Sequence, residues 1–253
     1  MTLHRFHLAP ECWASERPEL SPADAHHCAD VLRLGPGDRI EVFDGRGNVA
    51  GAELLDAHRK HCTLKIGSPK ATPGPCCRIT LAQAVPKGKN MDLILQKAAE
   101  LGASVIVPLL SARTVVKVAD STEGEHKRER WQQIVLEACK QCGRNTVPQV
   151  EAPCTVEAFL QRRSPDDLLL LASLQPDARP LKEILAAHVS SRGGPPAVVT
   201  VLVGPEGDFT PEEIAQAKEA GALPLTLGPM ILRTETAALY CLSVLGHELF
   251  GVA

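Results

Sequence analysis

The chain has 253 residues, 44% of them hydrophobic and 23% charged, a balance that predicts a globular protein with a substantial core and excludes disordered and fibrous classes. Its formal net charge is −3, but residues 78–150 hold 11 Lys and Arg against 7 Asp and Glu, a local net charge of +4. Such a surplus can attract nucleic-acid phosphates although the whole chain is acidic, with a solvated helix face as the alternative explanation.

Short strands separated by turns dominate the first seventy residues. Strands are predicted at 3–8, 39–44, 48–55 and 61–66. One helix interrupts them, because Ser21 is a good N-cap residue and Pro22 suits the first helical position. Strands with a single helix predict a small β-barrel over residues 1–70.

The pattern changes after residues 68–75, a segment rich in proline and glycine that predicts a linker. Strands are predicted at 78–84, 104–110, 167–172, 198–203 and 223–227. Helices are predicted at 91–101, 125–142, 156–162, 181–188, 211–220 and 234–250. Continuous apolar runs such as 168–171 are typical of parallel strands buried on both faces, so the fold class of residues 77–253 is α/β.

Two glycine-bearing loops near the end of the chain carry the strongest functional signal. The first glycine loop, residues 204–209, follows an apolar strand and leads into a helix with Thr210 as N-cap and Glu213 as capping-box acid. The second glycine loop, residues 228–233, also joins a strand to a helix start. Both therefore offer backbone N–H groups at the carboxyl end of a parallel strand, where open α/β sheets bind ligands.

The side chains of these loops favour an adenosine bearing a cationic sulfonium over a phosphate ligand. Ile231 and Leu232 offer an apolar slot for an adenine ring, whose edge can bond to the backbone. Glu206 and Asp208 would repel a phosphate, and no Walker-type lysine follows. A plain turn explains either loop alone, but two such loops in this order favour a binding site.

The amino-acid sequences of the two loops resemble the signature of the RsmE family, GPEG-x-F-(S/T) followed by LG-x-x-ILRTETA. These are bacterial methyltransferases of the SPOUT class that modify N3 of a uridine in 16S ribosomal RNA of the small subunit. The resemblance covers nearly the whole chain, with further matches at 26–27, 31–34, 42–45, 87–89, 96–102 and 141–145. Two positions depart from the family pattern: Asp208 stands where a second glycine is common, and Met230 where an arginine is frequent.

The resemblance implies two domains. Residues 1–70 would form a PUA-like RNA-binding β-barrel, and residues 77–253 a SPOUT methyltransferase domain, α/β with a deep trefoil knot, holding the cofactor site and a dimer interface. It implies S-adenosyl-L-methionine (SAM) as cofactor and a homodimer acting on 16S rRNA in the assembled small ribosomal subunit. The apolar residues of the predicted helix 234–250 are consistent with a buried interface.

The resemblance also implies the site residues. The cofactor contacts would be Ala172, Ser173, Val203, Gly204, Glu206, Gly207, Leu227, Gly228, Ile231, Leu232, Thr234, Glu235, Thr236 and Ala237. Methylation at N3 first requires loss of the N3 proton, which spreads negative charge onto the uracil oxygens, and Arg233 is the candidate to stabilise that charge, because guanidinium stays protonated. A salt bridge to Glu235 or Glu206 is the alternative role of Arg233. Glu206 is a weaker candidate, as proton acceptor, and could instead order the loop.

Candidate RNA contacts are cations that would position a phosphate backbone without reading bases. They are Lys87, Lys89, Arg113, Lys117, Lys140 and Arg144, with Arg5, Arg33 and Arg46 on the small barrel. Because the chain has only 5 Phe, 1 Tyr and 2 Trp, recognition by shape and charge is expected. Two other functions stay open: a non-catalytic RNA-binding or ribosome-assembly protein, and the same chemistry on another RNA nucleotide.

Nothing in the sequence indicates export, a membrane or a metal. No apolar run reaches the roughly twenty residues of a membrane span, and residues 1–7 lack a signal-peptide core. The nine scattered cysteines predict reduced thiols in the cytoplasm. Cys139 and Cys142 have the spacing of two thiols that bind one metal ion, but a structural zinc site needs two further ligands, which the sequence does not offer nearby. A buried thiol on a helix is therefore the favoured role, and no metal is expected.

Overall fold

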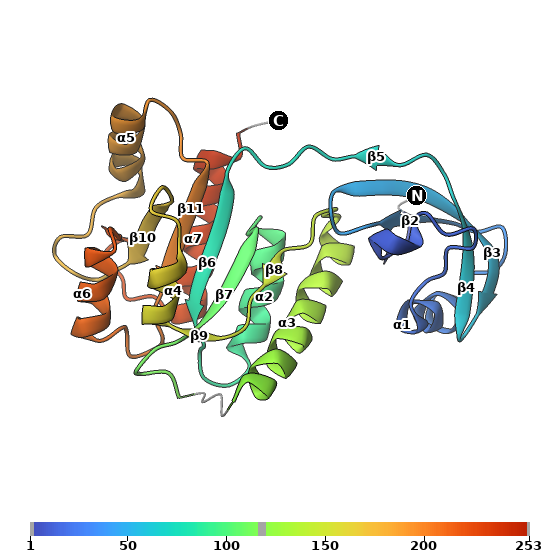
Figure 1. Cartoon of the computed structure of the whole chain (residues 1–253), viewed down its shortest axis with the longest axis horizontal. Coiled ribbons are helices and arrows are strands. Elements are labelled where there is room, and N and C mark those ends of the chain that lie inside the picture. Colours follow the sequence, from blue (N-terminus) through green and yellow to red (C-terminus); the bar gives the residue numbers. More distant parts are fainter. Residues whose placement is uncertain (1–2, 116–119, 252–253) are drawn as a thin grey trace. The chain divides into compact units, whose positions relative to one another are not determined.

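The computed structural model describes residues 3–115 and 120–251, which form two compact units (Figure 1). The first unit contains Met1–Gly74 and Leu136–Val147, and the second contains Pro75–Val135 and Pro148–Ala253. Each unit has its own sheet and its own apolar core. Among the described residues, no helix combines the length and apolar character that crossing a bilayer requires.

The first unit is built on a five-stranded sheet. Its order is β1-β2-β3-β4, with β5 also paired to β3; β1 and β2 run parallel and the other pairs antiparallel. The strands are β1 (Arg5–His7), β2 (Arg39–Phe43), β3 (Asn48–His58), β4 (His61–Ile66) and β5 (Lys70–Ala71). The four predicted strands are confirmed, and β5 lies inside the predicted linker.

A short helix covers the core of this sheet. Ser21 accepts a hydrogen bond from the backbone N–H of Asp24 at 3.2 Å, so α1 (Pro22–His26) begins as predicted. The helix continues as a π turn, η2 (His27–Val31), and a 3-10 turn, η1 (Pro10–Cys12), precedes it. Ala25 and Cys28 are fully buried and join the apolar cluster of the strands.

Residues 136–147 complete the first unit, which the sequence did not indicate. They include the end of α3 (Ser121–Cys142). The Lys140 ammonium pairs with the Asp24 carboxylate at 2.6 Å, and Arg5 donates to the Asn145 side chain at 2.8 Å. The predicted boundary followed chain order, whereas these polar contacts join segments far apart in sequence.

The second unit is a parallel α/β sheet, as predicted. Its strand order is β12-β10-β11-β6-β7-β8, with β9 also paired to β7, and all pairs are parallel. The strands are β6 (Arg78–Ala84), β7 (Val105–Leu110), β8 (Gln149–Val150), β9 (Cys154–Thr155), β10 (Leu168–Ala172), β11 (Val198–Val203) and β12 (Leu223–Leu225). Only the two-residue strands β8 and β9 were not predicted, because two residues carry no periodicity.

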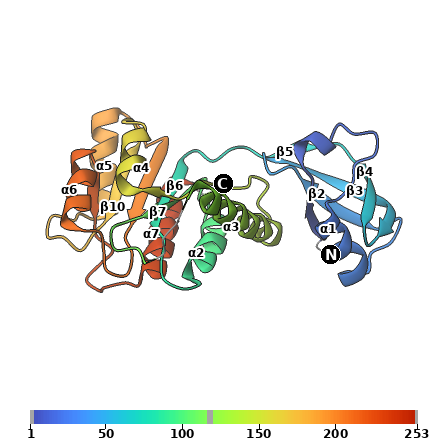
Figure 2. The same ribbon diagram turned by 60° about the horizontal axis from the view of Figure 1, so that its bottom comes forward.

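Helices lie on both sides of this sheet (Figure 2). They are α2 (Asn90–Glu100), the start of α3, α4 (Val156–Arg162), α5 (Leu181–Arg192), α6 (Pro211–Glu219) and α7 (Thr234–Leu249). Leu169 and Leu171 pack in the cluster with α4 and α6, while α7 contacts β6, β11 and α2. Strands buried on both faces explain the continuous apolar runs. The trefoil knot stays a prediction.

The strand order sets up a site at one edge of the sheet. Because β12, β10, β11 and β6 are parallel neighbours, their carboxyl ends lie side by side. The segments that leave β11 and β12 are the two glycine loops, and the segment that leaves β10 begins at Ser173.

Candidate active site

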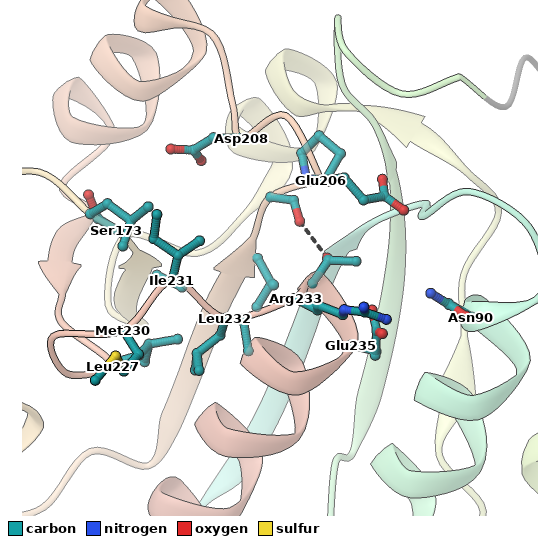
Figure 3. Close-up of a pocket in the computed structure, with 17 residues that line it drawn as sticks. Asn90, Ser173, Glu206, Asp208, Leu227, Met230, Ile231, Leu232, Arg233 and Glu235 are labelled. Atoms are coloured by element: carbon teal, nitrogen blue, oxygen red, sulfur yellow. Dashed lines mark hydrogen bonds between the residues drawn. The ribbon is translucent and has the colours of Figure 1, made fainter.

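A pocket of about 440 Å³ opens at this edge of the second unit (Figure 3). The ends of β10 and β11, both glycine loops and the first turns of α2 and α7 form its walls. Its lining residues are Asn90, Ala172, Ser173, Leu174, Val203, Gly204, Pro205, Glu206, Asp208, Leu227, Met230, Ile231, Leu232, Arg233, Thr234, Glu235 and Ala237.

The first glycine loop makes a tight turn that leaves little room at Gly204. The N–H of Asp208 donates to the carbonyl of Pro205 at 2.9 Å and closes the turn. A Cβ on Gly204 would lie 3.0 Å from the Asp208 carboxylate and 3.3 Å from the Phe209 nitrogen. Glycine suits this position, because a larger residue would crowd the part of the loop that folds back against it.

Asp208 adopts the left-handed conformation, with φ of +60°. This is the position at which the RsmE pattern commonly has glycine. Aspartate tolerates this region better than most residues, because its short side chain bonds locally; here the carboxylate accepts the Phe209 N–H at 2.8 Å. The departure from the family pattern therefore keeps a glycine-like backbone.

Hydrogen bonds to the start of α6 and to the segment after β7 hold the first glycine loop in place. Thr210 and Glu213 form the predicted capping box of α6. The second carboxylate oxygen of Glu213 accepts the N–H of Ala112 at 2.8 Å. The Arg113 guanidinium donates to the carbonyl oxygens of Gly207 and Phe209. The loop is thus anchored to the segment that follows β7.

A buried hydrogen-bond chain joins this loop to β6 and to α7. The Thr234 hydroxyl donates to the Gly204 carbonyl at 2.6 Å and accepts from the Gln83 amide at 3.0 Å. Gln83 is fully buried, and its amide nitrogen also donates to the Ala84 carbonyl at 2.8 Å. Gln83 was not predicted as a site residue. The one sequence feature that could have indicated its role is a polar amide side chain within the otherwise apolar end of strand β6.

The second glycine loop brings exposed apolar side chains to the pocket. Gly228 has a φ of +101°, which favours glycine whatever the space around it. Beyond it, Met230 is 70% and Ile231 84% exposed. Figure 3 shows Leu227, Met230 and Ile231 on one side of the pocket. Apolar side chains left this open at a pocket indicate a surface that a ligand covers.

Three polar residues, Arg233, Glu235 and Asn90, lie on the other side of the pocket in Figure 3. Glu206 accepts the backbone N–H of Lys87 at 2.9 Å and so connects the first glycine loop to the segment before α2. Arg233 is exposed at the N-cap position of α7. Within the described residues, no ion pair joins it to Glu206 or Glu235, so its guanidinium is available for a ligand.

The structure brings most of the predicted cofactor residues together. Both candidate catalytic residues, Arg233 and Glu206, line the pocket, with Ala172, Ser173, Val203, Gly204, Leu227, Ile231, Leu232, Thr234, Glu235 and Ala237. Gly207, Gly228 and Thr236 do not. A Cβ on Gly207 would face Arg113 behind the loop, and Gly228 shapes the turn. Asn90, Leu174, Pro205, Asp208 and Met230 line the pocket without having been predicted to bind the cofactor.

The predicted RNA-binding cations fall into two groups. The exposed group consists of Arg33, Arg46, Lys87 and Lys89, together with Arg113, whose guanidinium also donates to the carbonyls of Gly207 and Phe209. The other group has internal partners or is partly buried. Arg5 pairs with Glu41 and lies over the Phe43 ring, Lys140 pairs with Asp24, and burial lowers the pKa of Arg144. Lys117 lies outside the described residues.

A pocket built from loops at the carboxyl edge of a parallel sheet is the place where open α/β proteins bind small ligands such as nucleotides. Comparison with known families makes the class specific. The profile of the RNA methyltransferase domain matches residues 72–246, and that of the RNA methyltransferase PUA domain matches residues 20–67. The chain belongs to the RNA methyltransferase family and is an enzyme.

Matches to known relatives cover most of both chains. The chain is 36% identical over 237 residues to a ribosomal RNA small subunit methyltransferase E from Synechocystis, covering 92% of this chain and 74% of that protein. It is 34% identical over 226 residues to the protein of that name from Bacillus subtilis, covering 89% and 88%.

Solved structures of relatives share the whole fold. A methyltransferase of Legionella pneumophila, solved with bound SAM, is 33% identical with a TM-score of 0.86, and the match covers 98% of each chain. A ribosomal RNA small subunit methyltransferase E from Neisseria gonorrhoeae, bound to S-adenosyl methionine, is 32% identical with a TM-score of 0.84, also over 98% of each chain.

Proposed function

We propose that this protein transfers the methyl group of SAM to N3 of one uridine in 16S rRNA of the small ribosomal subunit. The observation that carries the proposal is the pocket itself, where two glycine loops and open apolar side chains meet Arg233. The relatives named as small-subunit rRNA methyltransferases, and those solved with SAM, support the same reaction class.

The residues of the pocket fit SAM in size and chemistry. A volume of about 440 Å³ lies within the range of small-molecule sites. Leu227 and Ile231 offer apolar surface to an adenine ring, and the carboxylates of Glu206 and Glu235 suit a cationic ligand. When bound, SAM supplies an electrophilic methyl group on its sulfonium. The protein's task is to hold the cofactor and exclude water.

The pocket offers Arg233 for the negative charge that forms when uridine N3 loses its proton before methyl transfer. Uridine N3 must lose its proton, and the resulting negative charge spreads onto the two uracil oxygens. An exposed guanidinium at the polar side of the pocket can donate to such an oxygen, and it stays protonated throughout. We assign Glu206 chiefly to loop order, because its carboxylate already accepts the Lys87 N–H.

The exposed cations are the proposed RNA footprint. Arg33 and Arg46 belong to the first unit, and Lys87 and Lys89 lie in the segment that borders the pocket in the second. In functional terms, residues 1–70 would serve RNA binding, and residues 77–253 methyl transfer and dimer formation. Backbone contacts of this kind position RNA, while specificity comes from the uridine itself and the shape around it.

The proposed active form is a homodimer that acts on the assembled small subunit in the cytoplasm, where its substrate resides. Tyr240 on α7 and Leu93 on α2 are 45% and 41% exposed, and these two helices pack together. A second copy covering them would remove apolar side chains from water. Sedimentation of the protein against a Leu93→Glu, Tyr240→Glu variant tests this part, with a dimer expected to become a monomer.

Two measurements test the proposal as a whole. Calorimetry should give one SAM per chain, and absence of binding would favour a non-catalytic RNA-binding protein. Small subunits from cells lacking the gene should then gain a single N3-methyluridine when incubated with protein and SAM, detected by mass spectrometry of the rRNA. Methyl transfer to a different nucleotide would keep the reaction class and overturn the uridine assignment.

A further inference from the structure

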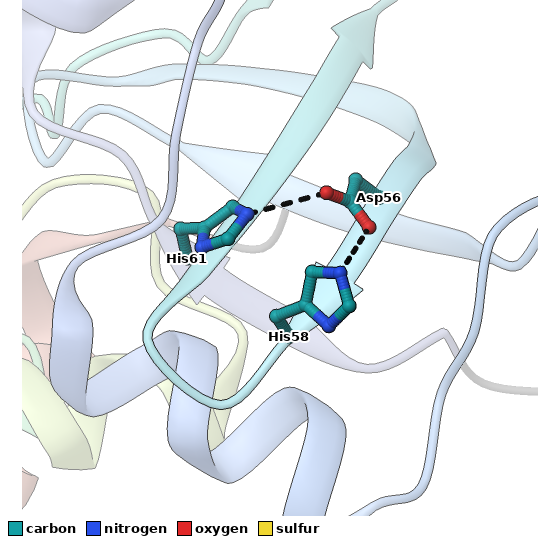
Figure 4. Close-up of side chains that lie close together, drawn as sticks. All are labelled: Asp56, His58 and His61. Atoms are coloured by element: carbon teal, nitrogen blue, oxygen red, sulfur yellow. Dashed lines mark hydrogen bonds and ion pairs between the residues drawn. The ribbon is translucent and has the colours of Figure 1, made fainter.

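Three potential metal ligands come together at the tip of the β3–β4 hairpin, in the first unit and outside the pocket (Figure 4). An oxygen of Asp56 lies 3.3 Å from Nε2 of His58, and its other oxygen lies 3.2 Å from Nε2 of His61. All three ligand atoms lie within 4.8 Å of one another. Elsewhere in the described part of the chain, no three His, Cys, Asp or Glu side chains meet this criterion.

A β-bulge puts these side chains on the same face of the sheet. The pairing of β3 with β4 shifts between Leu54 and Asp56, so Leu55 is an extra residue. Before the bulge Leu54 faces the core, and after it Ala57, opposite the buried Cys62, takes that side. Asp56 is thereby turned to the solvent face. Without the extra residue, alternation would place it on the core side, like Leu54.

The hairpin register completes the arrangement. His58 and His61 are direct cross-strand partners around the two-residue turn of Arg59 and Lys60, and their ring centroids are 5.0 Å apart. Asp56 precedes His58 by two residues and therefore shares its face. The paired strands fix the backbone of all three residues, while His58 and His61 are 66% and 48% exposed and keep room to rotate.

The distances suit a transition-metal ion. Two ligands bound to zinc at about 2.0–2.1 Å in a tetrahedral arrangement lie about 3.3 Å apart. The two nitrogen–oxygen separations, 3.3 and 3.2 Å, already match this value. These two separations involve different oxygens of Asp56, so binding requires the two imidazole nitrogens to approach each other and one of them to approach the oxygen that binds the ion, which rotation of the exposed rings allows. Two imidazoles with one carboxylate favour zinc-like ions over magnesium or calcium, which prefer oxygen ligands.

The surrounding charges permit a cation. Arg59, in the turn, directs its guanidinium to the Asp30 carboxylate at 3.3 Å. Two neutral imidazoles and the Asp56 carboxylate would reduce the charge of a divalent ion to +1, which exposed surroundings tolerate. Each Nε2 lies close to an oxygen of Asp56, so a metal ion would take the place of any proton held between nitrogen and oxygen.

We propose that Asp56, His58 and His61 form a binding site for a divalent transition-metal ion, with Zn²⁺ as the best match, and that this ion ties the two strands together at the hairpin tip. Three protein ligands leave a fourth coordination position for water or for a donor atom of a partner. No metal was predicted from the sequence, where only the cysteines show a metal-binding spacing; Asp56, His58 and His61 meet through the register of the hairpin. The site is independent of methyl transfer.

Calorimetric titration of the full-length protein with zinc chloride tests the proposal. The exposed thiols of Cys76 and Cys142 compete for zinc, so Cys76→Ser and Cys142→Ser form the common background. That background should bind one zinc ion per chain. Asp56→Asn, His58→Ala and His61→Ala should each abolish this binding. His26→Ala is the matched control, because His26 is also exposed and contacts a carboxylate, Asp30, at 2.8 Å without a second imidazole; it should bind zinc like the background.

The proposal is overturned if the background protein shows no saturable zinc binding, or if the three ligand variants bind zinc as the background does. A second readout does not depend on any hairpin variant being folded. In NMR spectra of the background protein, zinc should shift the ring signals of His58 and His61 and leave those of His188 unchanged. Unshifted His58 and His61 signals would equally contradict the site.

Discussion

The Thr234 hydroxyl donates a 2.6 Å hydrogen bond to the carbonyl oxygen of Gly204 and so ties the first turn of α7 to the first glycine loop. The two residues are thirty positions apart in the chain and both line the pocket. Gln83 of β6 in turn donates to the Thr234 oxygen, so two hydrogen bonds connect β6, the first turn of α7 and the first glycine loop.

Thr234→Val keeps the shape of the side chain but removes the hydroxyl, leaving the Gly204 carbonyl and one Gln83 N–H unpaired. The freed loop must then be reordered when a ligand binds, at a cost of about 1–2 kcal/mol, so SAM affinity should fall about 5- to 30-fold. Thr234→Ser, which retains the hydroxyl, is the control and should bind normally. Calorimetry compares the variants, and equal affinity for Thr234→Val would show that the bond does not order the pocket.

Gly204→Val should abolish SAM binding while the protein stays folded. The added Cβ would lie 3.0 Å from the Asp208 carboxylate, so the loop must open to admit it. Gly207→Ala is the matched control, since its Cβ would make an ordinary 3.5 Å contact with Arg113 outside the pocket. Wild-type affinity in Gly204→Val would remove the first glycine loop from the binding site.

The left-handed backbone at Asp208 predicts opposite behaviour of two substitutions. Asp208→Gly should keep unfolding free energy within about 1 kcal/mol of the wild type, because relief of strain offsets the greater freedom of the unfolded chain. Asp208→Val should destabilise by about 1–3 kcal/mol, since a β-branched side chain is strained at φ of +60°. Thermal unfolding measures both, and equal melting temperatures would argue against the left-handed conformation.

Arg233→Ala should lower turnover much more than SAM affinity. A donor aimed at developing charge is worth about 10²- to 10³-fold in rate, whereas cofactor binding rests mainly on the glycine loops. Arg233→Lys keeps the charge but loses the planar fork, so an intermediate rate is expected. Single-turnover methylation of small subunits gives the rate, and an unchanged rate in Arg233→Ala would end its catalytic assignment.

Thiol reactivity should follow burial. Burial raises the pKa of Cys139 and of Cys241 to about 12, so almost no thiolate forms there at pH 8, the state that reacts. Cys76 and Cys142 are exposed. Brief alkylation of the native protein followed by peptide mass spectrometry should label Cys76 and Cys142 first. Early labelling of Cys241 would contradict its buried position in α7.

The sequence predicted the α/β class and the two loops because these depend on local signals. An apolar run such as residues 168–171 and a capping box such as Thr210 with Glu213 are short and self-contained. What the sequence did not reveal depends on contacts between distant segments. Gln83 beneath Thr234, Asn90 at the pocket wall and the joining of residues 136–147 to the first unit arise only in three dimensions.

The RNA-binding residues illustrate the same limit. A lysine or arginine in a sequence carries the same charge whether or not a partner holds it. Lys140 pairs with Asp24 and Arg5 with Glu41, so internal ion pairs already engage two of the predicted phosphate contacts. Lys87 and Lys89, in contrast, are exposed in the segment that leads to the pocket. Only the fold could separate these two kinds of cation.

A crystal structure of the protein grown with SAM tests the central claim most directly. The account predicts one SAM molecule between the two glycine loops, with its adenine against Leu227 and Ile231 and its methyl group open toward Arg233. SAM bound at a different place, or a pocket filled by the protein's own side chains in the presence of saturating SAM, would contradict it.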